Sequence, residues 1–585
     1  MQQSGRFIGA GGARGAQGAP GVRRRFLGRR RFLALLGGLW LGLAGPACLA
    51  QSASASPWFD AGRPSARSHE ALALLADAPS HGLRAEDYGL AALHEAVAQA
   101  GRLPADAATA EALARALDAA LRAYLGDLRE GRVDPRQLHH DFEPPRRDPA
   151  TDPAALLQAA LARGRLAEAV REATPRLPQY EQLRGVLARY RSLAGHPAWQ
   201  QPLPTLPAAG QRGRPRTLEP GGDYAGLARL AERLVVLGDL AEVDAAPWLA
   251  PAAPSGAASV VVSAPPHARY EGALLAAVQA FQTRHGLGAD GRLGRATLAQ
   301  LDVPPAARAR QIELALERLR WTPALYGPRM IVVNVPEFVL RAYEVAADGR
   351  IELRLAMKVI VGQALRTQTP LLDEELRSIE LSPYWNVPPS IARQELVPEL
   401  RRSPGVWARE GYEFVTAGGA AATALTEGGL DAVLAGQARI RQRPGARNAL
   451  GTVKFVFPNR DSVYLHDTSA PGLFGRERRD FSHGCIRIEQ PLALARLVLR
   501  GQPEGDEAWL REALAGGRNT HVRVAQPWQV LIAYGTALVK EGRVFFFDDI
   551  YGHDRALDAA LQRPRPASPR GPAPVPVVSP PAARP

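Results

Sequence analysis

The residues best suited to chemistry stand together in the stretch RDFSHGCIRIEQP, which contains Ser482, His483, Gly484 and Cys485. A cysteine becomes a nucleophile when a nearby imidazole takes its proton or stabilises the thiolate. The chain has 585 residues and two cysteines, and the other one, Cys48, lies near the N-terminus. A buried and inert thiol is the commoner fate of cysteine. The histidine and glycine beside Cys485 nevertheless favour a reactive one.

Two short alternating runs predict further functional side chains beside this thiol. In SVYLHD, a period of two places Tyr464 and His466 on one face of a strand, and in CIRIE it does the same for Cys485 and Arg487. Two such strands side by side would present an imidazole, a thiol and a guanidinium to one surface. The backbone N–H groups of Gly484 and Cys485 can form an oxyanion hole, and the fork of Arg487 matches a substrate carboxylate. The pattern indicates acyl transfer from a carboxylated substrate.

The N-terminal segment indicates export. Residues 1–31 carry eight arginines and no acidic residue, and residues 32–50 form the apolar run FLALLGGLWLGLAGPACLA. This run is short and interrupted by glycine, as in the core of a signal peptide. We therefore predict a signal peptide over residues 1–50, with RRRFL similar to a twin-arginine export signal. An uncleaved anchor, which would leave the protein associated with the membrane, is the alternative.

Removal of this segment changes what the composition means. The formal net charge of +14 falls to about +6 without the eight arginines, and to near +2 without four more in the C-terminal tail. The basic composition is therefore no evidence for nucleic-acid binding. Cleavage would also leave Cys485 as the single cysteine in a compartment where paired thiols form disulfides. An unpaired thiol there suggests a free reactive group or intermolecular pairing.

The remaining sequence predicts an α+β multidomain protein. The region 51–223 is rich in Ala, Leu and Arg, and the spacing of Leu113, Leu117 and Leu121 in it is typical of one face of a helix. We therefore interpret this region as a helical scaffold domain. From residue 330 the pattern changes to alternating β-branched and aromatic residues. The predicted units after the scaffold are a small three-helix domain at 224–303, a connecting helix at 304–329, a β-rich catalytic domain at 330–522 with a helical capping insert at about 389–441, an α/β extension at 523–562 and a disordered Pro-rich tail at 563–585.

The segment 271–301 resembles the small peptidoglycan-binding domain. The resemblance rests on the pattern FQ-x3-GL-x2-DG-x2-G-x2-T. Glycines and turn residues fix a shape rather than a chemistry, so a packing role for this domain stays open beside glycan binding.

The spacing around the reactive stretch resembles that of a known enzyme family. His466 is followed by fifteen residues and then by Ser-His-Gly-Cys, as in the signature H-x(14–17)-[S/T]-H-G-C of the L,D-transpeptidases, whose catalytic domain is of the YkuD type. The stretches SPYWNVPPSIARQEL, RQRPGARNALGTVKFVFPN and FFFDDIYGHD, and the order of the domains, resemble the large periplasmic YcbB-like subgroup of Gram-negative bacteria. Arg487 stands where many L,D-transpeptidases have Asn, and the YcbB-like branch shares this arginine.

The resemblance assigns roles to individual residues. It implies that Cys485 is the nucleophile, that His466 is the base oriented by the backbone carbonyl of Asp467, and that His483 supports the thiolate or the oxyanion. No metal or cofactor is implied. The residues that would line the donor site are Ser482, Gly484, Arg487, Tyr464, Trp385 and, more weakly, the side chain of Asp467. A tryptophan after a Pro-Tyr step is also a common core residue.

The resemblance also implies a two-step reaction in cell-wall biogenesis and cell shape. Cys485 would attack the L-centre carbonyl of meso-diaminopimelate in a tetrapeptide stem and release D-Ala. The amine of a second diaminopimelate would then form a 3→3 cross-link, whereas water would give an L,D-carboxypeptidase and a D-amino acid would give exchange. The same resemblance implies acylation by carbapenems and a periplasmic location. It also implies peptidoglycan stems as partners, leaves other cell-wall synthases open as further partners, and implies no nucleic acid.

Three other classes fit parts of the sequence. A zinc hydrolase could use His466, His483 and Cys485, but His-Gly-Cys places two ligands only two positions apart and no HExxH motif accompanies them. In papain-like peptidases the cysteine precedes the histidine, and here His466 comes first. A non-enzymatic wall-binding scaffold would use only the helical regions and would not need Cys485.

Overall fold

The computed structural model describes residues 56–139, 142, 152–206, 208–209, 214–215, 217–249, 269–322, 327–364 and 367–565. The predicted signal peptide at 1–50 lies outside these residues, as does the predicted tail apart from residues 563–565. Among the described residues, no helix combines the length and the apolar character that a membrane crossing requires.

The N-terminal region is helical, as the sequence predicts, and begins with the short strands β1 (Phe59–Asp60) and β2 (Arg63–Pro64). Asp106 caps the longest helix by accepting a hydrogen bond from the Thr109 N–H, and the predicted leucine face of that helix is buried. The helices are α1 (Ala66–Ala76), α2 (Leu90–Arg102), α3 (Ala107–Glu130), α4 (Pro153–Arg163) and α5 (Leu166–Ala173). Their common core ends at Ala173.

Residues of the region 51–223 therefore belong to three cores rather than one, since Leu203 packs into the core of the small domain. Helix α6 (Pro178–Ser192) packs with α11 (Pro305–Trp321) and with the hairpin of β18 (Ala537–Lys540) and β19 (Arg543–Phe546). The buried face of α6, with Tyr180 and Leu187, packs on the connecting helix α11, and Tyr180 also contacts His81 of the scaffold region at 3.1 Å.

The small domain contains α7 (Leu227–Leu237), α9 (Gly272–Arg284) and α10 (Arg295–Asp302), with an added one-turn helix α8 (Glu242–Ala245). Within the FQ pattern, Gln282 accepts a hydrogen bond from the Gly291 N–H at 2.8 Å and donates to Asp290 at 3.1 Å. The motif residues thus hold the Asp-Gly turn, which agrees with their interpretation as shape-fixing residues.

The catalytic region is built on a sheet whose order, among the described strands, is β15-β7-β16-β14-β13-β8-β17-β5-β6, and β6 also pairs with β7. This second pairing closes the sheet into a ring around the largest apolar core of the described residues. The strands are β5 (Arg329–Asn334), β6 (Val339–Val345), β7 (Ile351–Gly362), β8 (Leu372–Leu381), β13 (Val453–Val456), β14 (Leu465–His466), β15 (Asp480–Ser482), β16 (Ile486–Ile488) and β17 (Thr520–Ala533). Helices α16 (Pro491–Val498) and α17 (Glu507–Ala515) follow the reactive stretch.

The predicted boundary between residues 522 and 523 is wrong, because it falls inside β17. This strand pairs along its length with β8 and, from Gln529 onward, with β5. The predicted extension therefore belongs to the catalytic sheet only as far as Ala533, its hairpin β18–β19 forms a separate sheet, and helix α18 (His553–Gln562) closes the described part of the chain apart from a few residues.

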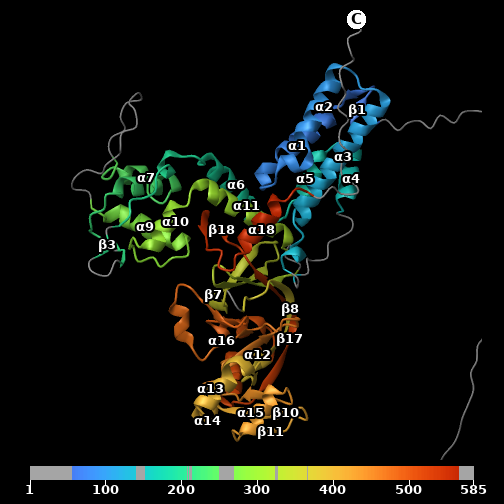
Figure 1. Ribbon diagram of the computed structural model, residues 1–585. Coiled ribbons are helices and arrows are strands. Elements are labelled where there is room, and N and C mark those ends of the chain that lie inside the picture. Colours follow the sequence, from blue (N-terminus) through green and yellow to red (C-terminus); the bar gives the residue numbers. More distant parts are fainter. Residues whose placement is uncertain are drawn as a thin grey trace, which may run out of the picture. The chain divides into compact units, whose positions relative to one another are not determined.

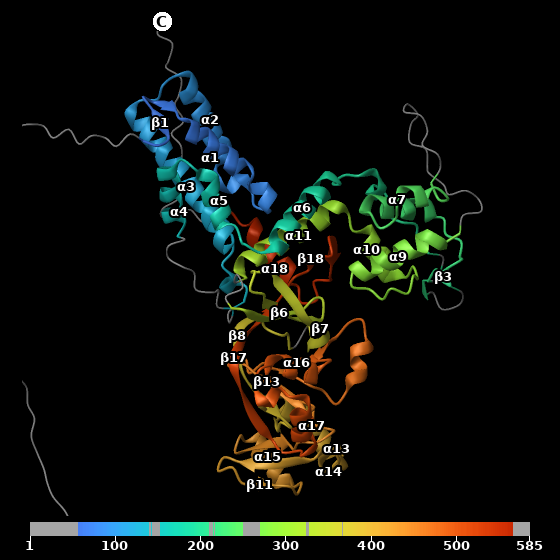
Figure 2. The ribbon, with the colours of Figure 1, turned by 180° about the vertical axis from the view of Figure 1, so that it is seen from behind.

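The prediction of a helical insert at about 389–441 is incomplete, because the insert contains strands as well as helices. Its helical elements are α12 (Pro389–Ile391), the π-turn η7 (Ala392–Leu396), α13 (Val397–Arg402), α14 (Gly405–Glu410) and α15 (Glu427–Leu434). A small sheet runs through it in the order β11 (Ala421–Ala422), β10 (Tyr412–Thr416), β12 (Ala438–Gln442) and β9 (Trp385–Asn386). Phe414 and Ile440 are buried partners across β10 and β12, which stabilises this sheet. Both views show these elements gathered together (Figure 1, Figure 2).

Candidate active site

The reactive stretch forms the turn between β15 and β16, and Cys485 is the residue immediately before β16. Strand β14 runs parallel to β16, with Leu465 opposite Ile486 and His466 opposite Arg487. The predicted neighbourhood of the two strands is therefore correct. The apolar Leu465 and Ile486 are fully buried in the sheet core, which fixes the register that brings His466 beside Arg487.

The His466 imidazole is buried, with 4% of the residue exposed, and its Nδ1 lies 2.5 Å from the backbone carbonyl of Asp467. A carbonyl only accepts hydrogen bonds, so Nδ1 carries the proton and Nε2 is left with its lone pair. Burial lowers the pKa of His466 to about 3, and the charge of Arg487 acts in the same direction. At neutral pH the ring is an uncharged imidazole whose free nitrogen can accept a proton.

The Cys485 thiol is half-buried, and its Sγ lies 3.8 Å from the carbonyl oxygen of Ser462. Burial raises the pKa of Cys485, although hydrogen bonding by Tyr464 opposes this shift. The Tyr464 ring also packs edge-on against His466, with centroids 5.6 Å apart. Burial favours the neutral form of each group, so the Cys485 thiol and the His466 imidazole are both uncharged at rest.

Arg487 offers a cation to an incoming anion. Its Nε is buried without a hydrogen-bond partner, and no carboxylate of the described residues lies within ion-pair distance of its guanidinium. A buried donor of this kind costs free energy until something binds it. The side chain is therefore well suited to a carboxylate of a bound substrate.

Ser482 and Gly484 shape the turn. The Ser482 hydroxyl donates to the Cys485 carbonyl at 2.6 Å and accepts from the Gly484 N–H at 3.2 Å. The Gly484 N–H is thus already bonded and does not contribute to an oxyanion hole as expected; the Cys485 N–H is left for that role. Gly484 has φ +110°, a conformation that favours glycine. Ser482 is buried, so it positions the turn rather than lining the substrate site.

The remaining predicted residues lie around this centre. His483 points to the insert, where its Nε2 is 2.9 Å from Glu395. The carboxylate of Asp467 is occupied by Thr452, which donates its N–H and its hydroxyl at 2.8 Å each, so it is not a substrate ligand. Trp385 is half-buried against the core of the insert. Its role as a wall of the donor site stays a prediction.

A layer of residues that the sequence did not reveal supports the turn from behind. Thr369 donates its hydroxyl to the Gly484 carbonyl at 2.8 Å and accepts from the Gly362 N–H at 2.9 Å. The Tyr551 hydroxyl donates to the Gly362 carbonyl at 2.7 Å and accepts from the Thr369 N–H at 3.2 Å. The segment before α18 thus supports the turn beside Cys485 through two hydrogen bonds in series, one between Tyr551 and Thr369 and one between Thr369 and Gly484. Tyr551 lies within the stretch FFFDDIYGHD, and the resemblance of this stretch to the YcbB-like subgroup was the feature of the sequence that could have indicated its role.

Tyr551→Phe is expected to slow thioester formation by about ten-fold and to lower the free energy of unfolding by about 1–2 kcal/mol, because it leaves two buried backbone groups without a partner. Urea unfolding and the acylation rate with a carbapenem measure both effects. Tyr124→Phe is the matched control, since the hydroxyl of Tyr124 is buried and has no partner among the described residues. Equal behaviour of the two variants would contradict the support role.

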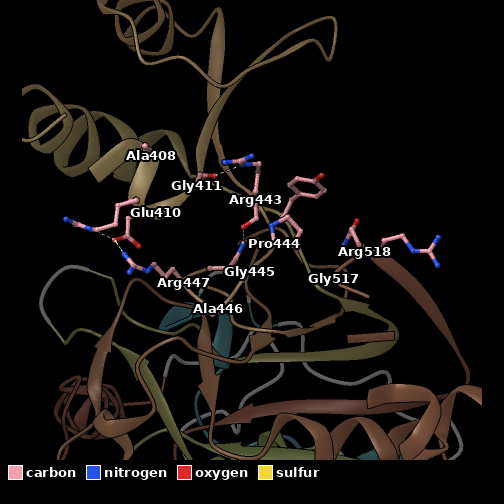
Figure 3. Close-up of a pocket in the computed structure, with 14 residues that line it drawn as sticks. Ala408, Glu410, Gly411, Arg443, Pro444, Gly445, Ala446, Arg447, Gly517 and Arg518 are labelled. Atoms are coloured by element: carbon pink, nitrogen blue, oxygen red, sulfur yellow. Dashed lines mark hydrogen bonds and ion pairs between the residues drawn. The ribbon is translucent and has the colours of Figure 1, made fainter. Parts of the chain in front are cut away.

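A polar pocket of about 740 Å³ lies at the base of the insert and is lined by none of the nine predicted site residues (Figure 3). Segments that enter and leave the insert both line it, through Tyr384 and residues 443–448. Among the described residues, no three His, Cys, Asp or Glu side chains gather as a metal site would require. His466, His483 and Cys485 are therefore not arranged as the ligand set of a zinc hydrolase.

Comparison with known proteins agrees with this geometry. Residues 328–505 match the L,D-transpeptidase catalytic domain, residues 50–187 match a scaffold domain, and residues 261–301 match a family described as "Putative peptidoglycan binding domain". Over 250 residues the chain is 30% identical to a "Putative L,D-transpeptidase" of Haemophilus influenzae; the match covers 43% of this chain and 49% of that protein, so the chain spans about half the length of this relative. The chain thus contains an L,D-transpeptidase catalytic domain together with a scaffold domain and a peptidoglycan-binding domain.

Proposed function

We propose that this protein is an L,D-transpeptidase that forms 3→3 cross-links between diaminopimelate residues of peptidoglycan through a thioester on Cys485. The observation that carries the proposal is the pairing of β14 with β16, which sets His466 beside Arg487 and next to the Cys485 turn. The matched peptidoglycan-binding domain supports a cell-wall substrate and therefore a place outside the cytoplasm. The signal peptide and the periplasm remain predictions.

In the first step a tetrapeptide stem binds with a carboxylate on Arg487. The Cys485 sulfur attacks the carbonyl carbon of the L-centre, and Nε2 of His466 takes the thiol proton. The tetrahedral oxyanion accepts a hydrogen bond from the Cys485 N–H. As the C–N bond breaks, His466 returns the proton to the leaving amine, and D-Ala departs while the thioester remains.

Binding of the donor would also activate the base. After burial, the charge of Arg487 is the largest influence that lowers the pKa of His466. A substrate carboxylate on Arg487 neutralises that charge, so the imidazole becomes more basic when the stem is in place. The free enzyme would keep its thiol protonated and become reactive only with a carboxylated donor bound.

In the second step an amine of another stem attacks the thioester carbonyl. A proton of the attacking amine passes to His466 as the C–N bond forms and the C–S bond breaks, and the Cys485 sulfur recovers that proton. Water in place of the amine would release a tripeptide, and a D-amino acid would give terminal exchange at the same site.

The test is intact mass spectrometry of the purified protein after mixing with meropenem, for the wild type and for Cys485→Ala. We expect one drug-mass adduct on the wild type alone, because the thiolate opens the β-lactam ring. Muropeptide digestion of treated peptidoglycan should then show 3→3 cross-linked dimers.

A folded wild-type protein without an adduct would contradict the proposal and favour a non-enzymatic scaffold. An adduct that persists on Cys485→Ala would show that another nucleophile reacts. An adduct without dimers, but with tripeptides, would identify the carboxypeptidase reaction instead.

A further inference from the structure

A row of polar side chains extends from the candidate site across the catalytic sheet. Arg487 lies opposite His466, His466 opposite Lys454, Lys454 opposite Glu380, and Glu380 opposite His521. Residues directly opposite each other in neighbouring strands project from the same face of a sheet. Five strands therefore contribute one polar residue each to a single line, with His466 between two cations.

Lys454 and Glu380 form an ion pair within this row. The Lys454 Nζ is 3.4 Å from Oε1 of Glu380, and His521 lies 3.9 Å from the same oxygen. The two paired side chains keep 18% and 15% of their surface exposed, so neither is fully buried. Lys454 Nζ also lies 4.5 Å from the centre of the Tyr464 ring, which itself packs on His466. One aromatic ring thus separates the ion pair from the reacting groups.

The residue type at position 454 is unusual for this chain. Of 72 basic residues, three are lysines, namely Lys358, Lys454 and Lys540, and the rest are arginines. An arginine presents its donors in a rigid planar fork, whereas the lysine ammonium is a compact point charge with three rotatable donors. Lys454 can therefore keep its bond to Glu380 and still accept a second carboxylate.

We infer that Lys454 and Glu380 form a subsite for the acyl acceptor that recognises an amine with a carboxylate on the adjacent carbon, the head group of an α-amino acid. The ammonium of the acceptor would bind the carboxylate of Glu380, and the carboxylate of the acceptor would bind the ammonium of Lys454. Two ion pairs of opposite direction would then form side by side. The inference rests on the proposed second step, and it places donor and acceptor carboxylates on opposite sides of His466, at Arg487 and at Lys454.

Proton balance fits this arrangement. The bound ammonium first releases one proton to solvent. The neutral amine then leaves Glu380 while its carboxylate stays on Lys454, and it attacks the thioester; its second proton passes to His466 while the Cys485 sulfur leaves. Water and simple amines carry no carboxylate for Lys454, so the subsite would favour transfer to amino-acid acceptors over hydrolysis.

The experiment compares two acceptors, D-methionine and D-methioninamide, with a tetrapeptide donor and the full chain. Both acceptors have the amine, and the amide lacks the carboxylate. We expect Lys454→Gln to lower transfer to D-methionine by about ten-fold or more relative to transfer to the amide. Lys454→Gln also removes a charge that lowers the pKa of both His466 and Cys485, so carbapenem acylation is measured in parallel and the ratio between the two acceptors is the readout. Lys540→Gln is the matched control, since Lys540 forms a similar ion pair with Glu337 at 2.9 Å.

The outcomes separate the inference from the proposed function. Equal loss with both acceptors, which leaves the ratio between them unchanged, would overturn the subsite while leaving the transpeptidase intact. Absence of any thioester in the wild type would overturn the proposed function itself. Should Lys454→Gln fail to fold, Lys454→Arg carries the test: its wider fork should change the acceptor ratio by about three-fold or more, and an unchanged ratio would refute the subsite.

Discussion

His466→Gln is expected to lower the rate of thioester formation by about 10²–10⁴-fold, the usual contribution of a general base. Glutamine can still donate to the Asp467 carbonyl, but it has no nitrogen lone pair that takes the Cys485 proton. Single-turnover acylation by a carbapenem, followed by intact mass, measures the rate. His94→Gln, on the exposed face of α2, is the control and should react as the wild type.

The pH dependence of the same variant gives a second readout. Burial lowers the pKa of His466 to about 3 in the folded chain against an ordinary value of 6.5. As the pH falls, His466 is protonated in the unfolded chain before it is protonated in the folded chain. The contribution of the neutral ring to the free energy of unfolding is therefore fully present above pH 6.5 and is lost as the pH falls towards 3. The wild type should lose up to about 2 kcal/mol more than His466→Gln between pH 7 and pH 5, measured by urea unfolding.

Two results would contradict this account of His466. Acylation by His466→Gln at the rate of the wild type would show that the thiol ionises without the ring. A parallel pH dependence of the two proteins would show that His466 is protonated normally in the folded state.

Gly362→Ala is expected to abolish thioester formation, with a loss of about 3 kcal/mol or more in the free energy of unfolding. A Cβ at this position would lie 1.9 Å from the backbone oxygen of Thr367 and 2.8 Å from the Thr369 nitrogen. Neither backbone atom can move without displacing the hydrogen bond from Thr369 to the Gly484 carbonyl. A displacement of about 1 Å at a nucleophile can cost about 10²-fold in rate.

Gly472→Ala is the matched control for this substitution. Gly472 lies in the loop between His466 and Cys485, and a Cβ there would meet no atom within 4 Å. Thermal unfolding and carbapenem acylation should both be close to those of the wild type. Comparable damage from the two substitutions would mean that the loop, and not the Gly362 contact, controls the turn.

The sequence was sufficient for the centre of the site. Period-two alternation in SVYLHD and CIRIE predicts which residues share a face, and the structure places His466 and Arg487 opposite each other on neighbouring strands. The carbonyl of Asp467 also contacts the imidazole as the family resemblance implies. These features are local, since each depends on two or three consecutive residues.

The features that the sequence did not predict depend on distant contacts. The bond between the Gly484 N–H and Ser482 follows from the path of the turn, and the support from Tyr551 follows from how the chain folds back on itself. The run LDEELRSIEL of strand β8 does not alternate cleanly, so the sequence does not reveal where this strand lies, and its pairing with β17 shifts register midway. The strands of the insert are two to five residues long, too short to outweigh its helices.

The closure of the sheet has a consequence for how activity is acquired during folding. The ring is complete only when β17 pairs in parallel with β5 and antiparallel with β8, so the first and last strands of the catalytic region must find each other. Pairing between segments so far apart is slow, because loop closure costs entropy before any contact repays it. Tyr551, which supports the nucleophile turn, follows β17 in the chain. A refolding chain should therefore regain its helical circular-dichroism signal early and its reactivity with carbapenems late. The Cys485 thiol would thus stay unreactive until the domain is assembled.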